Sequence, residues 1–157
     1  MKYSFLVHLT VLFTSCSLKD SEQQPIPEPI DYTVQNENEI KAYIQENKLE
    51  AVRTESGLYY VIDEAGTGKQ PTANSNVTVA YKGFFTNKKV FDQSSEKGIS
   101  FSLQKVIQGW TEGIPYFKEG GSGILLVPSH LAYGSYDYLG IPGGSVLIFN
   151  VKLISVN

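Results

Sequence analysis

Residues 105–113 read KVIQGWTEG and contain Trp110, the only tryptophan in the chain. This residue follows the apolar pair Val106 and Ile107 and comes directly after Gly109, with no histidine or cysteine nearby. A lone tryptophan in a small domain most often fills the core. The glycine beside it also predicts a bend, an unusual place for the largest side chain when no reactive group is near. The stretch alone therefore favours a core residue and leaves open whether the tryptophan has a functional role.

The composition limits the class of protein. The chain has 157 residues, which predicts one domain with short extensions. Ten tyrosines, eight phenylalanines and fourteen glycines favour strands joined by tight turns over a helical bundle. The formal net charge is −3, and the lysines are scattered rather than gathered in a stripe. We therefore expect no nucleic acid partner, because nucleic acid phosphates require a basic surface.

The cysteine and histidine counts limit the chemistry. Cys16 is the only cysteine, which excludes a disulfide framework and a cysteine-rich metal site. His8 and His130 are the only histidines, and they lie too far apart in the chain for a zinc site. We therefore expect no metal and no cofactor.

The chain begins with features of a targeting segment. Lys2 gives a positive start, and residues 5–13 form an apolar run. This run is shorter than the ~20 residues needed to span a bilayer, so it fits the apolar part of a signal peptide better than a membrane span. We therefore predict a signal peptide over residues 1–15.

The residues around the cysteine resemble the lipobox of bacterial lipoproteins. Small residues at positions 14 and 15 directly precede Cys16, although Phe13 stands where a leucine is usual. An unpaired cysteine at the end of the apolar run predicts lipidation at Cys16, and an ordinary signal peptide is the alternative. Ser17 follows Cys16, which favours the outer membrane over the inner membrane as the site of a lipid anchor in the cell envelope.

Residues 16–35 are predicted to be a stalk. They are polar, and Pro25, Pro27 and Pro29 stand at every second position. Such a stretch favours extended polyproline II structure and acts as a semi-rigid spacer, with a proline-motif ligand as the alternative. We expect the stalk to pack little, so that a chain starting near Asn36 folds and acts like the longer one.

The next region, residues 36–56, is predicted to hold an amphipathic helix and a connection. Apolar residues from Ile40 to Leu49 recur at spacings near three and four, which is typical of a helix with one buried face. Asn36 or Asn38 would be the N-cap, since asparagine is favoured there.

The remaining chain reads as strands around one short helix. GWTEGIPYFKEG (109–120) predicts the helix, which Pro115 should shorten or distort because it lacks an amide hydrogen. The predicted class is α+β, with an antiparallel sheet packed on a helix. Strands are expected within GLYYVIDEAG (57–66), NVTVAYKGFF (76–85), KKVFDQSS (88–95), GISFSLQKVI (98–107), GGSGILLVPSHLAYG (120–134) and GGSVLIFNVKLISV (143–156).

Five stretches in this order resemble the FK506-binding protein (FKBP) family of peptidyl-prolyl cis-trans isomerases: VTVAYKGFF, VFDQSS, VIQGWTEG, VPSHLAYG and IPGGSVLIFNVKLI. The resemblance covers about residues 57–155, and the preceding helix and stalk resemble those of lipid-anchored bacterial members. It implies that residues 57–157 form an antiparallel half-barrel curled around one short helix. It also implies rotation of X–Pro bonds in exported proteins by desolvation in an aromatic well, without covalent chemistry.

The resemblance also implies the site. Trp110 would be the floor of a proline-sized well, while the backbone N–H of Ile107 and the hydroxyl of Tyr133 would hold substrate carbonyls. Asp92 would orient Tyr81 and Lys97. The catalytic set carried over from the family is Tyr81, Phe91, Asp92, Tyr133 and Phe149, and the substrate-binding set is Phe101, Val106, Ile107, Trp110 and Ile141.

Two positions depart from the family pattern. Lys97 stands where an arginine often pairs with the aspartate, and Tyr138 or Leu139 stands where some relatives carry a histidine. The partners implied are proline-containing segments of exported proteins and macrolide inhibitors of the FK506 class, and a monomer is expected. The alternative function is a catalytically weak module that binds proline-containing peptides on the cell envelope.

Overall fold

The structure is a computed structural model and describes residues 28–157. The predictions of a signal peptide, of lipidation at Cys16 and of most of the stalk lie outside the described residues. The elements are α1 (Thr33–Asn47), β1 (Val52–Arg53), β2 (Tyr59–Glu64), β3 (Asn76–Phe85), β4 (Val90–Gln93), β5 (Ile99–Ser102), η1 (Leu103–Lys105), α2 (Gln108–Gly113), η2 (Ile114–Tyr116), β6 (Ser122–Val127), η3 (Ser129–Leu131) and β7 (Leu147–Val156).

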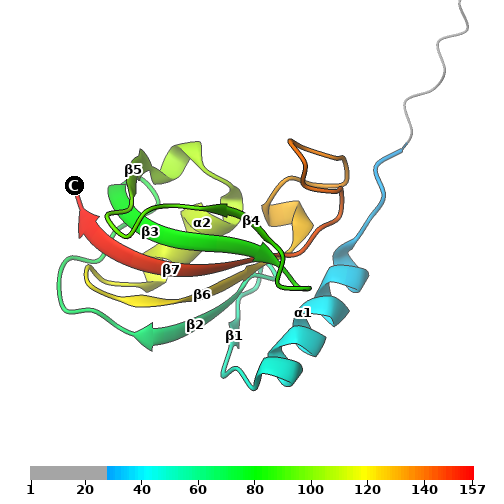
Figure 1. The fold of residues 1–157 in the computed structure, drawn as a ribbon, viewed down its shortest axis with the longest axis horizontal. Helices are drawn as coiled ribbons and strands as arrows, with labels where there is room; N and C mark the ends of the chain where they lie inside the picture. Colours follow the sequence, from blue (N-terminus) through cyan, green and yellow to red (C-terminus); the bar gives the residue numbers. More distant parts are fainter. Residues whose placement is uncertain (1–27) are drawn as a thin grey trace, which may run out of the picture.

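The strands form one antiparallel sheet of seven strands in the order β1-β2-β6-β7-β3-β4, with β5 pairing with β3. The long strands β3 and β7 pair along their whole length at the centre of the sheet. Figure 1 shows the sheet curling around α2, which lies against its concave face. The predicted α+β half-barrel is confirmed, and each predicted strand segment contains an observed strand.

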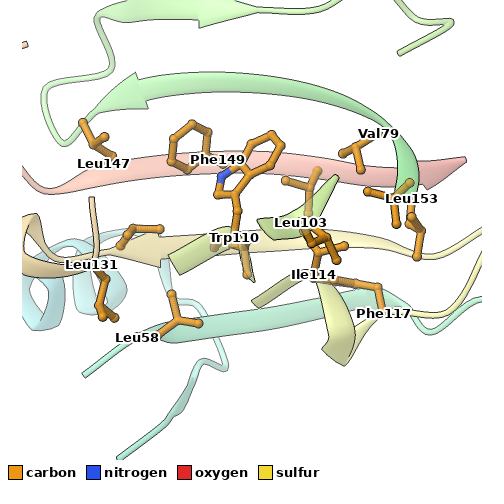
Figure 2. Packing of buried hydrophobic residues seen from close by; sticks show 14 of the residues in the cluster. Leu58, Val79, Leu103, Trp110, Ile114, Phe117, Leu131, Leu147, Phe149 and Leu153 are labelled. Atoms are coloured by element: carbon orange, nitrogen blue, oxygen red, sulfur yellow. The ribbon is translucent and has the colours of Figure 1, made fainter. Parts of the chain in front are cut away.

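The main core lies between the concave face of the sheet and α2. In β3, Val77 and Val79 are buried while Thr78 between them is less so, as the period of two in a strand requires. Figure 2 shows side chains of α2 and η2 packed among those of β3 and β7, with Trp110 and Ile114 in the middle.

The helix after Trp110 is short, as Pro115 predicted. α2 has six residues, and its end continues directly into the 3₁₀ turn η2. Pro115 lies in this turn, where its missing amide hydrogen costs no α-helical hydrogen bond. The short α2 holds Trp110 on the concave side of the sheet.

A second core lies on the opposite face, beneath α1. β6 is buried on both sides, because Leu125 faces α2 while its neighbour Leu126 packs with Ile40 and Tyr43 of α1. At the helix surface, Glu37 accepts a hydrogen bond of 2.8 Å from the Tyr59 hydroxyl. α1 is therefore an integral part of the fold.

The predicted N-cap of α1 is wrong. The helix begins at Thr33, so Asn36 lies inside it and is fully buried. The exposed amide of Thr33 donates instead to the carboxylate of Asp31, at 2.9 Å. The pattern misled because an asparagine at the start of an apolar run is usually a cap, whereas this one has tertiary partners.

The expectation that residues 16–35 pack little is wrong at Ile30 and Tyr32, which contact the folded domain. The carbonyl oxygen of Ile30 accepts a hydrogen bond of 2.6 Å from the Ser135 hydroxyl. The ring of Tyr32 lies so close to Gly144 that a Cβ at that glycine would come within 2.5 Å of it.

Among residues 28–157, no helix is both long and apolar enough to cross a bilayer.

Candidate active site

A cavity of about 780 Å³ opens at one end of the concave face, between the sheet, α2 and the segment after η3. It brings together residues far apart in the chain, from β3 to β7. Nine of the ten residues predicted from the resemblance line it, namely Tyr81, Phe91, Asp92, Phe101, Val106, Ile107, Trp110, Tyr133 and Phe149.

Trp110 lies at the bottom of this cavity, with only 5% of its surface exposed. Its ring meets those of Tyr81 and Phe149 edge to face, with centroids 5.0 and 5.2 Å away, and lies tilted against Phe101 at 5.4 Å. Edge-to-face packing directs the positive edge of one ring at the negative face of another. The two interpretations of Trp110 therefore both hold, since it packs with the core and lines the cavity.

The indole nitrogen of Trp110 is buried and has no hydrogen-bond partner among residues 28–157. Figure 2 places this nitrogen on the side of Phe149. An aromatic face is a weak acceptor, and a buried donor without a full hydrogen bond costs about 1–3 kcal/mol. The base of the cavity is therefore an apolar environment with an unsatisfied donor.

One polar pair lies in the aromatic wall. Tyr81 on β3 and Asp92 on β4 occupy paired strands, and the Tyr81 hydroxyl donates to Asp92 Oδ2 at 2.5 Å. Burial, together with this bond and the charge of Asp92, raises the pKa of Tyr81 well above its usual value. The prediction that Asp92 orients Tyr81 agrees with this geometry. The pairing with Lys97 was wrong, since no ion pair joins it to Asp92 in the part of the chain described.

Two hydrogen-bonding groups at the cavity are unoccupied. The backbone N–H of Ile107, at the N-cap of α2, makes no hydrogen bond to any residue between 28 and 157. The hydroxyl of Tyr133 has none to these residues either. Burial, followed by the charges of Tyr138 and Asp92, raises the pKa of Tyr133, so the hydroxyl is a neutral donor near pH 7. Both groups belong to residues that line the main cavity and can donate a hydrogen bond.

Ile141 is the one predicted residue that does not line the main cavity. It lines a neighbouring cavity of about 360 Å³, together with Val90 and Leu139. The two cavities share Phe91, Asp92, Tyr133 and Tyr138 as walls. Ile141 therefore lies next to the main cavity, across the residues that the two cavities share.

Four further residues line the main cavity, and sequence reasoning did not place them in the site: Ile99, Lys105, Gln108 and Ala132. Tyr138, which the sequence offered with Leu139 at the position where some relatives carry a histidine, lines the cavity as well. Lys105 and Gln108 flank the predicted pair Val106 and Ile107, so adjacency was a usable signal. Tyr138 stacks on Tyr133 with ring centroids 4.7 Å apart.

No group of three or more metal-ligating side chains occurs among residues 28–157.

Comparison with known proteins identifies the family to which the fold and the cavity belong. The family model described as FKBP-type peptidyl-prolyl cis-trans isomerase matches residues 67–154. FkpA of Escherichia coli strain K12, an FKBP-type peptidyl-prolyl cis-trans isomerase, is 45% identical over 112 residues, which are 69% of this chain and 42% of the relative. The crystal structure of FkpA from Escherichia coli matches with a TM-score of 0.71 at 37% identity, covering 80% of this chain and 61% of that chain.

A second solved structure has a length closer to that of this chain. The peptidyl-prolyl cis-trans isomerase from Pseudomonas syringae matches with a TM-score of 0.69 at 28% identity, covering 83% of this chain and 99% of that chain. The curled sheet, the short helix and the aromatic cavity define the class, and the chain belongs to the FKBP-type peptidyl-prolyl cis-trans isomerase family. It spans about half the length of the curated relatives it matches.

Proposed function

We propose that this protein is a peptidyl-prolyl cis-trans isomerase that rotates X–Pro bonds in the main cavity. The observation that carries the proposal is the juxtaposition of a buried tryptophan floor with two unoccupied donors, Ile107 N–H and the Tyr133 hydroxyl. A proline ring is apolar and compact, and the carbonyls next to it need donors. The cavity offers both kinds of contact within one site.

The chemistry needs no nucleophile. The barrier to rotation of a peptide bond is ~18–20 kcal/mol and comes from amide resonance. The planar amide is more polar than the twisted one, so the rings around Trp110 destabilise the planar form relative to the twisted transition state. Each tenfold gain in rate requires about 1.4 kcal/mol, which a few such contacts can supply.

The polar residues have separate roles in this proposal. Ile107 N–H and the Tyr133 hydroxyl bind carbonyl oxygens on either side of the rotating bond and stabilise its twisted geometry. Asp92 fixes the Tyr81 ring through the bond of 2.5 Å and makes one wall of the cavity polar. Neither Asp92 nor Tyr81 has to transfer a proton in this proposal.

A protease-coupled assay on tetrapeptides that differ in the residue before proline tests the proposal. We expect catalysis, best with an apolar residue before proline, and inhibition by a macrolide of the FK506 class. Binding of a proline-containing peptide without acceleration of isomerisation would instead establish the alternative, a catalytically weak peptide-binding module.

We further propose that the domain acts on proline-containing segments of exported proteins while tethered to the cell envelope by lipid on Cys16, with the outer membrane favoured by Ser17. Support comes from the apolar run before the cysteine and from the absence of any other cysteine in the sequence. A monomer is the expected state.

The tether is tested with Cys16→Ser in the full chain. We expect the variant to leave the membrane fraction and to accumulate as a soluble protein or an uncleaved precursor. Incorporation of labelled fatty acid into the variant as well as the parent would refute lipidation at this residue.

A further inference from the structure

Asn36 on α1 is a fully buried polar residue with two long-range backbone partners. Its Nδ2 donates to the carbonyl oxygen of Gly144, and its Oδ1 accepts from the amide of Ser129, each at 2.8 Å. A carbonyl can only accept and an amide can only donate, so these partners fix the orientation of the side-chain amide.

These two partners bracket residues 129–144, here called the rim loop. Inside the loop, the Gly134 amide donates to Ser129 O at 2.8 Å, and the Gly144 amide donates to Gly134 O at 2.9 Å. The two ends of the rim loop are therefore joined through Gly134 and are both held by Asn36. A buried amide with both of its polar atoms bonded fixes the positions of its partners, since a break leaves unpaired polar groups.

The rim loop carries two of the aromatic residues that line the main cavity. Tyr133 and Tyr138 stack with an interplanar angle of 12°. Tyr138 is in turn held by a pair of hydrogen bonds of 2.9 Å with Ile141. Apart from η3 at its start, the loop contains no helix and no named strand, so hydrogen bonds rather than a sheet must determine its position.

α1 is suited to hold this loop because the sheet fixes the helix independently. Ile40 packs with Leu126 and Ile148 on the convex face, one turn after Asn36. In Figure 1 the start of α1 lies beside the loop that leads into β7. Tyr32 against Gly144 adds a second contact between this end of the helix and the rim loop.

We propose that Asn36 is a positioning residue for isomerisation: through Ser129 and Gly144 it holds the rim loop so that the Tyr133 hydroxyl and the Tyr133–Tyr138 stack meet the substrate. The inference rests on the proposed function for its catalytic consequence. It assigns to α1 a direct part in shaping the substrate cavity.

The first test compares Asn36→Ala with Ile40→Ala in the full chain, at a temperature where both variants are folded by circular dichroism. Both lose buried contacts of α1, but only Asn36→Ala releases the loop. We expect Asn36→Ala to lower kcat/KM for a tetrapeptide at least fivefold, mainly through KM. Amide hydrogen exchange should quicken at Ser129 and Gly134 while β7 stays protected. Ile40→Ala should lower the melting temperature and leave KM and the exchange of both amides as in the wild type.

The second test uses Asn36→Asp, whose protonated carboxyl group can both donate to Gly144 O and accept from Ser129 N. The ionised form can only accept. Full burial at this position raises the pKa of the introduced carboxyl group, so the neutral form gains as the pH falls. We expect the KM of this variant, divided by that of the wild type, to fall toward one as the pH is lowered from about 8 to about 5. Asp31, Tyr32, Glu37 and His130 lie near this end of α1 in both proteins, so the ratio isolates the effect of the substituted side chain.

An Asn36→Ala protein with wild-type KM and unchanged exchange at Ser129 would overturn the proposal. If that variant does not fold, Asn36→Asp decides, and a pH-independent KM ratio overturns it. A wild-type chain without isomerase activity would refute the proposed function, whereas the exchange measurement would still show whether Asn36 holds the rim loop.

Discussion

Trp110 owes its position to the residue before it. A Cβ on Gly109 would lie 2.4 Å from Cγ1 of Val127, so only glycine lets α2 approach β6 this closely. In this arrangement the indole packs edge to face with Tyr81 and Phe149. The glycine beside the tryptophan therefore permits the close packing of α2 on β6.

Phe91 and Asp92 supply an apolar wall and a polar wall of the same cavity. We expect Phe91→Ala and Asp92→Ala each to lower kcat/KM on a tetrapeptide at least tenfold, a loss of about 1.4 kcal/mol in transition-state binding. Tyr116→Ala is the control, because Tyr116 stacks on Tyr60 outside the cavity. Unchanged turnover in both folded cavity variants would favour the peptide-binding module.

Tyr81 makes stability depend on pH in the alkaline range. Its pKa is raised by burial and by the bond to Asp92, while an unfolded tyrosine has a pKa of about 10. Above about pH 10 the unfolded chain releases this proton and the folded chain keeps it, so the free energy of unfolding falls as pH rises. We expect the fall, measured by urea unfolding at several pH values, to be less steep in Tyr81→Phe. Equal slopes in the two proteins would contradict the assignment.

At the scale of elements, the contact between α2 and β6 decides how the helix sits on the sheet. We expect Gly109→Ala to destabilise the protein by about 1–3 kcal/mol, because the added methyl group overlaps Val127. Val127→Ala makes room for that methyl group. The double variant should therefore be more stable than the sum of the two single effects predicts. Strict additivity in urea unfolding would show that the helix shifts away freely.

α1 shows how an element acquires a different role in the tertiary structure. Its apolar spacing predicted a helix with one buried face, and Ile40 and Tyr43 are indeed buried. The sequence predicts an N-cap at Asn36 or Asn38, whereas Asn36 lies inside the helix and is buried one turn before Ile40. Its partners lie about a hundred residues away in the chain, at Ser129 and Gly144. Periodicity reports a buried face and cannot report which loop a polar residue on that face will bind.

At the scale of the whole molecule, the connection from Tyr133 to Val146, which contains most of the rim loop and leads into β7, is short. No helix or named strand lies between η3 and β7 that could form an additional surface for an unfolded chain beside the site. We therefore expect good activity on tetrapeptides, weak acceleration of proline-limited protein refolding and weak suppression of aggregation. The rate per enzyme on a tetrapeptide is compared with that on a refolding protein. Equal efficiency on both would mean that another surface, such as α1, holds the unfolded chain.

The class of fold and nine of the fourteen residues that line the main cavity could be predicted from the sequence. Alternation in β3 and β7, the break at Pro115 and the ordered motifs around Trp110 are local or linear features, which a sequence records directly. The resemblance that the ordered motifs carry implied nine of the cavity residues, which lie between positions 81 and 149.

The hydrogen-bond and ion-pair partners of the polar groups could be found only in the tertiary structure. It placed Ile141 in the neighbouring cavity, left Lys97 apart from Asp92 and bound Asn36 to the two ends of the rim loop. The periodic spacing of apolar residues in the sequence indicates which side chains of an element are buried. A hydrogen bond instead requires two groups within about 3 Å in a fixed direction, and the folded path of the chain alone sets that geometry.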